Sequence, residues 1–167
     1  LSSVSFGKGL TKIENSTFEF CTSLTSITIP DHVTEIGDSA FDDSGLTSIT
    51  IPDSVTTIGQ SAFNYCTALT SITIPESVTN IGMGAFHGCS SLTSIDLPDS
   101  VTSIGNSAFN GCTALTSIVI PNSVTSIDGM AFGDCVNLTY MTFEGTVEQW
   151  NAIAKGDYWN DYVPATE

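Results

Sequence analysis

Two consecutive stretches of the chain are nearly identical: LTSITIPDSVTTIGQSAFNYCTA at residues 46–68 and LTSITIPESVTNIGMGAFHGCSS at residues 69–91. The pattern extends in both directions, with a leading leucine every 23 residues except for one step of 22. These leucines are Leu1, Leu24, Leu46, Leu69, Leu92, Leu115 and Leu138. A fixed period of this length is typical of repeat proteins, in which each unit stacks on the next. The spacing therefore predicts a solenoid and argues against a helix bundle or a Greek-key sandwich.

The chemistry of one unit divides it into four pieces. The segment Leu-Thr-Ser-Ile-Thr-Ile alternates apolar and hydroxyl residues, which is typical of a half-buried strand, and the proline that follows in five units ends that strand. Val-Thr-x-Ile then predicts a second short extended piece, after which a glycine permits a bend at Gly37, Gly59, Gly82 and Gly105. The Ser-Ala-Phe stretch has room for one helical or 3₁₀ turn.

One unit cannot bury its apolar side chains alone, so stacking must create the core. Stacking in register places identical residues about 4.8 Å apart, the spacing between neighbouring strands. The repeat then predicts a continuous ladder of phenylalanine rings along the axis, formed by Phe18, Phe41, Phe63, Phe86, Phe109 and Phe132.

The consensus LTSITIPxSVTxIGxxAFxxC resembles the BspA-like class of leucine-rich repeats, which occurs in surface proteins of bacteria and some protists. The similarity covers residues 1–143 in about six repeats, which we predict to form one solenoid domain. The resemblance implies an α/β repeat solenoid: a leucine-rich-repeat right-handed superhelix with a parallel β-sheet on its concave face, and short strands and helical turns elsewhere. It also implies adhesion or partner binding, at the cell surface or after secretion. Three departures are Gly7 in place of the proline, Asp128 in place of the glycine, and a unit from Leu24 without its cysteine.

Beyond residue 143 the repeat ends, and we expect residues 144–167 to form a C-terminal cap. Thr146 and Gln149 have the spacing of a capping box, and apolar residues follow at helical spacing. A helix is therefore predicted from Val147 to Ala154, with Gly156 ending it.

Three aromatic residues of this last segment, Trp150, Tyr158 and Trp159, are expected to cover the open end of the core. At the other end the chain begins at Leu1 in mid-pattern, without an initiator methionine or a secretory leader. We interpret the chain as part of a longer protein whose targeting signals lie elsewhere, and we expect this part to be monomeric.

Composition and charge exclude several classes of function. The 167 residues include 18 Asp and Glu against 3 Lys and Arg, which gives a net charge of −15. Such a chain repels nucleic acid and anionic lipid. The sequence also has no run of 18 apolar residues, so no membrane insertion is expected within it.

The five cysteines, Cys21, Cys66, Cys89, Cys112 and Cys135, share one repeat position. An odd number at spacings of 45, 23, 23 and 23 argues against a paired disulfide framework. Stacked thiols also point the same way instead of toward one another. We interpret them as a buried thiol ladder, and the absence of a CxxC motif argues against zinc.

No sequence motif points to catalysis or to a cofactor. His32 and His87 occupy different repeat positions, and the patterns GxGxxG, HExxH and GxSxG are absent. Asp38, Asp42 and Asp43 cluster near the short unit and offer oxygens to Ca²⁺, although a solvated turn is the favoured interpretation. A second acidic row, at Asp31, Asp53, Glu76 and Asp99, needs no cation either.

The strand segments offer a surface, because their second, third and fifth residues point away from the predicted core. These residues form uncharged hydroxyl rows, which Asp96, Val119 and Tyr140 interrupt toward the C-terminal end. The candidate partner-binding concave face therefore comprises Thr93, Ser94, Asp96, Thr116, Ser117, Val119, Thr139, Tyr140 and Thr142. The competing interpretation is that threonine is simply a favoured residue on exposed strands.

These observations predict a non-catalytic, adhesion-type module that binds a protein or a glycan and belongs to a larger cell-surface or secreted protein. Two alternatives are a structural spacer and a regulatory or targeting domain attached to an enzyme. A third, the binding of ice or another crystal surface, is suggested by the regular Ser-x-Thr rows.

Overall fold

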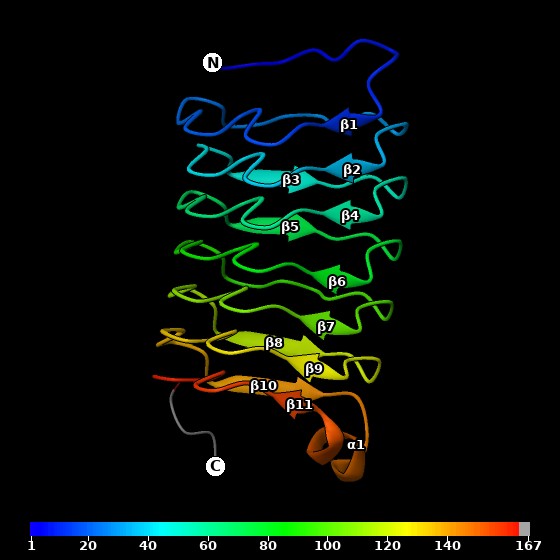
Figure 1. Cartoon of the computed structure of the whole chain (residues 1–167). Coiled ribbons are helices and arrows are strands. Elements are labelled where there is room, and N and C mark those ends of the chain that lie inside the picture. The colour runs from blue at the N-terminus through cyan, green and yellow to red at the C-terminus, as the bar shows by residue number, and fades with distance from the viewer. Residues whose placement is uncertain (164–167) are drawn as a thin grey trace.

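The computed structural model describes residues 1–163 and shows coils stacked in a nearly straight column (Figure 1). We number the coils 1 to 7 from the leading leucines, so that coil 1 begins at Leu1 and coil 7 at Leu138. Coils run through a strand segment, a corner, a return strand and a turn before rising to the next level. The predicted solenoid of stacked parallel strands is therefore confirmed. Of the predicted cap, residues 164–167 lie outside the described residues.

One parallel sheet is built from the segments that follow the leading leucines. Its register advances by one repeat per strand, so that Ile49 lies beside Ile72. The coil from Leu92 joins this sheet through bridges of Asp96 to Thr73 and Val119. The strands are β3 (Ser48–Thr50), β5 (Ser71–Thr73), β8 (Ser117–Ile120) and β10 (Tyr140–Phe143).

The second extended piece of each unit forms one short return strand, and these strands build two further parallel sheets, a three-stranded one in coils 1 to 3 and a four-stranded one in coils 4 to 7 (Figure 1). The return strands pair in the same way, with Ile104 beside Ile81 and Ile127. They are β1 (Lys12–Ile13), β2 (Glu35–Ile36), β4 (Thr57–Ile58), β6 (Asn80–Ile81), β7 (Ser103–Ile104), β9 (Ser126–Ile127) and β11 (Ala154–Lys155).

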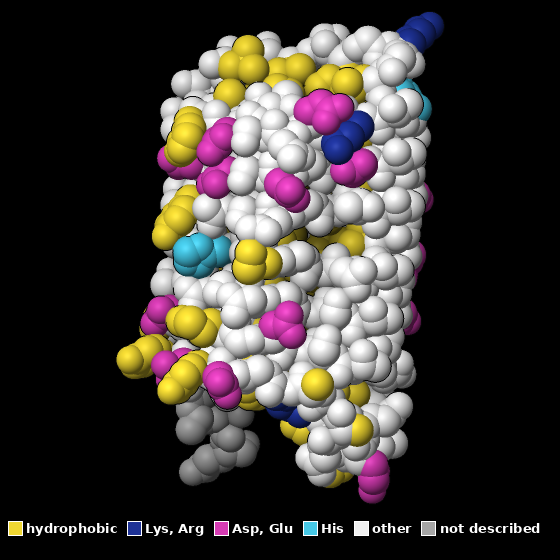
Figure 2. Space-filling view, viewed as in Figure 1, with side chains coloured by type: hydrophobic (Ala, Val, Ile, Leu, Met, Phe, Trp, Pro, Cys, Tyr) yellow, Lys and Arg dark blue, Asp and Glu magenta, His cyan; other side chains and the backbone are white. Residues whose placement is uncertain are grey.

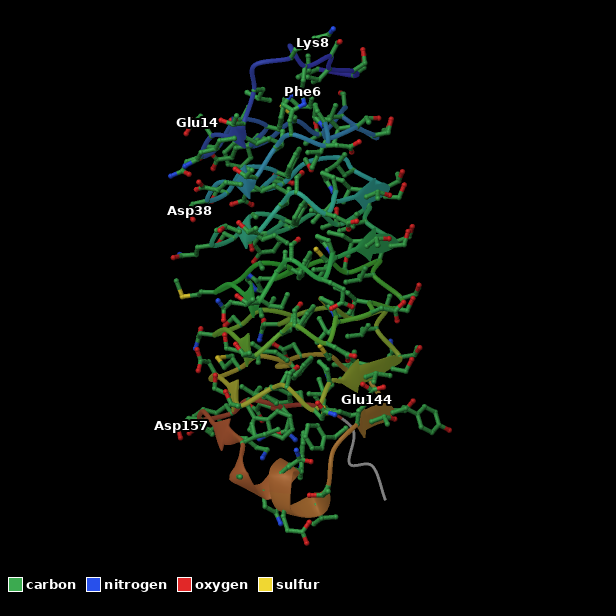
Figure 3. The ribbon with its side chains drawn as sticks, turned by 90° about the vertical axis from the view of Figure 1, so that its right-hand side faces the viewer. Phe6, Lys8, Glu14, Asp38, Glu144 and Asp157 are labelled. Atoms are coloured by element: carbon green, nitrogen blue, oxygen red, sulfur yellow. The ribbon has the colours of Figure 1, made fainter. Side chains whose placement is uncertain are left out.

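The core lies between the strand segments and the return strands and contains the predicted ladder of identical side chains. The six phenylalanine rings stack with centroids 5.2 to 5.6 Å apart, and the rings from Phe41 to Phe132 are fully buried. Burying one such ring stabilises the fold by about 1.5 to 3 kcal/mol. At the N-terminal end Phe6 covers Phe18 edge-on, with ring centroids 6.0 Å apart (Figure 3).

The turns differ from a helical turn in their backbone. Hydrogen bonds to the third preceding residue do occur, from Ala40 to Gly37 and from Asp42 to Ser39. In each coil, however, two residues four positions apart have positive φ, as at Ser39 (51°) and Asp43 (51°). Because the handedness alternates, N–H groups point along the axis and bond to the next coil, as Phe41 N does to Ala62 O. The turns therefore add hydrogen bonds between neighbouring coils to those made by the strand segments and the return strands.

The irregular unit from Leu24 keeps the cysteine position but fills it with a serine. Ser44 is buried, and its hydroxyl lies 3.3 Å from Cys66 Sγ. The missing residue comes directly after it, where Gly45 is required because a Cβ atom would collide with the carbonyl oxygen of Thr22. The unit from Leu24 is thus shorter by one residue, and its buried side chains still stack on those of the neighbouring coils.

The predicted C-terminal helix exists but is shorter than expected. Helix α1 (Val147–Ala152) begins with the capping box of Thr146 and Gln149. It ends at Ala152, not Ala154, because Ala154 joins strand β11 and pairs with β9. Gly156 therefore does not end the helix. It follows strand β11 directly, and glycine is required there because a Cβ atom would collide with Gly129 N.

The end of the core is covered mainly by the segment after the helix. Trp159 packs edge-on against Phe132 with centroids 6.3 Å apart, and Trp150 contacts Phe143 and Trp159 in turn. The N–H groups of Met130 and Phe132 donate to Asp157 and Trp159. Residues 154–163 therefore continue the return strand and the turn of the repeat as the last coil.

Candidate functional site

We define the strand face as the exposed side of the sheet that contains β3, β5, β8 and β10. All nine residues predicted for partner binding are exposed on it. The parallel register places Tyr140 beside Ser117, Thr142 beside Val119 and Val119 beside Asp96. The structure therefore brings these residues together in coils 5 to 7, and Tyr140 projects furthest with 73% of its surface exposed.

The hydroxyl rows of the strand face are less available to a ligand than the sequence suggests. Thr70 donates its hydroxyl proton to the carbonyl oxygen of Thr47 at 3.0 Å, and Thr47 does the same to Thr25 at 3.2 Å. In coil 7, Thr139 bonds in this way to Thr116 at 3.4 Å. Thr47, Thr70 and Thr139 therefore use their hydroxyls to link neighbouring coils, and the interruptions of the rows are the more distinctive features of this face.

A hollow of about 360 Å³ lies where Asp96 and Val119 interrupt the rows. Its apolar lining comes from Ile74, Leu97, Pro98 and Val119, and its acidic lining from Glu76, Asp96, Asp99 and Glu144. Glu144 occupies the repeat position that is proline in five coils, so a comparison of the units could have singled it out. The hollow combines a small apolar floor with carboxylates that can accept hydrogen bonds or attract a cationic group.

Of the aspartates considered for Ca²⁺, Asp38 lies on the opposite side of the stack from Glu144 (Figure 3). Asp38 Oδ1 accepts a bond from Gln60 N at 2.8 Å, and Asp42 Oδ1 accepts one from Asn64 Nδ2 at 2.9 Å. Within residues 1–163, no group of three or more His, Cys, Asp or Glu is arranged to hold a metal ion. These carboxylates link neighbouring coils.

The cysteine column is buried as predicted in four of its five members. Each of these thiols donates to a phenylalanine carbonyl, as Cys89 Sγ does to Phe63 O at 3.1 Å. Burial raises the pKa of Cys66 to about 11 and that of Cys135 to about 12, and raises the pKa of Cys89 and Cys112 well above its ordinary value. At physiological pH these thiols are therefore protonated, and a protonated thiol is a weaker nucleophile than a thiolate.

A polar row on the turns was missed by the sequence analysis, which noted only that His32 and His87 occupy different repeat positions. His87 Nδ1 and Asn64 Oδ1 are 2.9 Å apart, and Asn64 Nδ2 donates to Asp42. The row ends at Asn110, whose Nδ2 is buried and has no hydrogen-bond partner within the described part of the chain. The signal was present, since all four residues directly follow the ladder phenylalanine of their coil.

A second hollow, of about 560 Å³, opens at the C-terminal end of the core beside α1. Its walls include Trp150, Trp159, Phe143 and Met141, with Thr146 and Asn160 as the polar groups. Met141 and Phe143 are only half-buried, whereas the equivalent Ile118 of coil 6 is 3% exposed. The last strand is thus covered less completely than the strands inside the stack.

The comparisons with known proteins agree with this repeat geometry. The family model described as a BspA type leucine-rich repeat region matches six copies, over residues 1–112 and 34–154. The chain belongs to the BspA-type leucine-rich repeat family. No curated protein matches it.

Three solved structures are similar to this BspA-type chain. A leucine-rich repeat protein of T. pallidum is 32% identical, with a TM-score of 0.82 over 92% of this chain and 72% of that one. A leucine-rich repeat protein of Eubacterium ventriosum is 24% identical, with a TM-score of 0.78 over 94% of this chain and 44% of that one. A leucine-rich cell surface protein of Faecalibacterium prausnitzii is 28% identical, with a TM-score of 0.48 over 92% of this chain and 62% of that one. This chain spans less than two thirds of the latter two proteins.

The BspA-type chain is thus a leucine-rich repeat protein. No helix in residues 1–163 combines the length and the apolar character that crossing a membrane requires. Further statements about partners and location are made below as proposals.

Proposed function

We propose that this protein is a non-catalytic binding module, in which the strand face of coils 5 to 7 recognises a protein or a glycan. The observation that carries the proposal is the hollow where Asp96 and Val119 depart from the hydroxyl rows. An exposed tyrosine, Tyr140, lies on the same face, and tyrosine is enriched in the energetic centres of binding sites. Solenoids present extended surfaces of this kind to their partners.

We further propose that the module acts as a monomer within a larger protein at the cell surface or outside the cell. The support is the membership of the BspA-type family, whose resemblance implied adhesion. The acidic surface, with a net charge of −15, is consistent with a module that stays apart from nucleic acid and anionic lipid.

An array of glycans and host proteins, probed with wild type and two variants, tests this function. We expect a saturable signal for at least one ligand, and Tyr140→Ala or Thr142→Ala to weaken it about tenfold, as removal of a central contact does. Thr50→Ala is the matched control, because Thr50 occupies the position of Thr142 in coil 3, outside the hollow.

An equal response of Thr142→Ala and Thr50→Ala would show that the strand face of coils 5 to 7 has no special role. Silence of the wild type on every ligand would favour the structural spacer. Binding to ice would instead appear as thermal hysteresis in solution.

A further inference from the structure

A second surface of the molecule carries exposed aromatic side chains that the repeat does not require. We define the turn corner as the turn segments 16–20, 39–43, 61–65, 84–88, 107–111, 130–134 and 158–162. Figure 2 shows hydrophobic and acidic side chains interspersed down the side of the column on which these turns lie. The turn corner is separate from the strand face, so the two surfaces can be tested independently.

Aromatic residues of the turn corner occupy positions with positive φ, a backbone conformation that is unfavourable for bulky side chains. The last residue of each turn has positive φ, and coils 4 and 5 place Gly88 and Gly111 there. Coils 1 and 3 instead carry Phe20 (φ 57°) and Tyr65 (φ 49°). A bulky side chain in this region costs roughly 1 to 2 kcal/mol. The rings recover little of this by burial, since Phe20 is 67% and Tyr65 48% exposed.

Tyr65 is nevertheless held in a fixed position. Its ring lies directly over Gly88, where an added Cβ atom would come within 2.6 Å of Tyr65 Cδ1. The ring also packs against His87, with centroids 4.9 Å apart and planes at 60°. His87 is tied to Asn64, and Asn64 to Asp42. A half-exposed ring that is ordered before binding loses little conformational entropy when a partner covers it.

Carboxylates surround these rings without a cation of this chain to neutralise them. Asp43 occupies the position between Phe20 and Tyr65 in the intervening coil, and Glu19 and Asp42 lie beside it. Burial raises the pKa of Asp42, and the charges of Glu19 and Asp43 add to the effect. Both ion pairs found in residues 1–163 belong to Lys12, away from the turn corner.

We propose that the turn corner of coils 1 to 3 binds a basic segment of a partner protein, with an arginine or lysine side chain seated between Phe20 and Tyr65 and against Asp43. Phe20 and Tyr65 are two coils apart, or about 10 Å at the strand spacing, and Asp43 holds the same position on the coil between them. Aromatic faces attract a guanidinium or ammonium group, and carboxylates bind it through charge-assisted hydrogen bonds. A neutral glycan could stack on the rings but would bring no positive charge to Glu19 and Asp43, so the charge favours a basic protein segment.

The double variant Phe20→Gly/Tyr65→Gly tests the proposal, because it keeps the net charge and copies the residue of coils 4 and 5. The probes are a synthetic peptide of alternating arginine and serine and a serine–glycine peptide of equal length, measured by calorimetry at about 0.15 M salt. We expect the wild type to bind the arginine peptide, and the variant to bind it at least about tenfold more weakly, as the loss of two cation–π contacts predicts. Its melting temperature should be unchanged or higher, because glycine relieves the positive-φ strain.

A charge-matched pair of variants separates a specific site from general attraction to an acidic protein. Asp43→Asn and Asp53→Asn remove one carboxylate each, the first from the turn corner and the second from the exposed segment after Pro52, outside both the turn corner and the hollow. We expect only Asp43→Asn to weaken binding of the arginine peptide clearly, and Tyr140→Ala to leave it unchanged. Equal weakening by both aspartate variants, or full binding by the glycine variant, would overturn the proposal. A glycan signal that the glycine variant loses while the arginine peptide fails to bind wild type would also overturn it, in favour of a glycan site.

Discussion

At the scale of single residues, the cysteine column explains why one side chain recurs at one position. The thiol is small enough for the space behind the phenylalanine ladder, and it can donate to the carbonyl of the preceding coil, as Cys112 Sγ does to Phe86 O at 3.2 Å. Ser44 fills the same position in coil 2, which shows that size and a donor are the requirements. Packing and hydrogen bonding thus account for the repetition of cysteine at this position.

The buried thiols predict a loss of stability at alkaline pH. Their pKa values are raised in the folded state above the ordinary value of 9.0, so the folded chain keeps protons that the unfolded chain releases above pH 9. The free energy of unfolding should therefore fall as pH rises beyond 9, by about 1.4 kcal/mol per pH unit for each thiol. Urea unfolding between pH 8 and pH 11 measures this slope.

A serine variant provides the control for the alkaline effect. Cys112→Ser imitates Ser44 and removes one of the four fully buried thiols, so the slope above pH 9 should become about one quarter shallower. An unchanged slope would mean that the thiols do not govern the alkaline transition.

At the scale of elements, the sequence predicted what depends on side-chain periodicity and missed what depends on backbone handedness. Alternation of Ile with Thr identified the strand segments, and the capping box identified the start of α1. The alternation of backbone handedness in the turns was not predictable in the same way. Positive φ occurs at Ser61, Asp43 and Tyr65, and these residue types do not by themselves indicate it. The end of α1 was misplaced because pairing of β11 with β9 outweighs helix propensity at Ala154.

The capping box predicts a local weakness at the C-terminal end. Thr146 Oγ1 accepts a bond from Gln149 N, and the Gln149 side chain accepts one from Thr146 N. Thr146→Ala should destabilise α1 and the attached β11 by about 1 kcal/mol, since removal of an N-cap leaves orphan donors. Hydrogen exchange should report this as faster exchange at Ala154 N, which bonds to Thr125 O, while the amides of β4 keep their protection.

Asn151→Ala is the matched control for that experiment. Asn151 lies in the same helix and is exposed, but it takes no part in the cap. Because alanine favours helices more than asparagine does, exchange at Ala154 should be unchanged or slower. Faster exchange in both variants would assign the effect to the helix as a whole and not to the cap.

At the scale of the whole molecule, stacking in register is what made the fold predictable and the binding site less so. Identical side chains at one position fix the core, since Phe63 must meet Phe41 and Phe86 whatever the partner of the protein is. Function depends on the departures from the repeat. Asp96 and Val119 were recognised as departures, whereas Glu144 and Tyr65 acquired significance only when the structure placed them beside a hollow and a neighbouring ring.

The same additivity predicts that a whole coil can be removed. Deletion of residues 69–91 excises one complete repeat of 23 residues and joins Ala68 to Leu92, a junction equivalent to the one it replaces. Phe63 then meets Phe109 at the ordinary spacing, so all remaining coils keep an equivalent neighbour on each side. We expect a folded protein whose urea m-value falls by about one seventh, in proportion to the surface lost. Deletion of residues 69–79 instead removes a strand and its corner but leaves the return strand and the turn, and it should abolish cooperative unfolding. If both deletions unfolded the protein, its stability would depend on the particular sequence of coil 4 and not on contacts between equivalent coils.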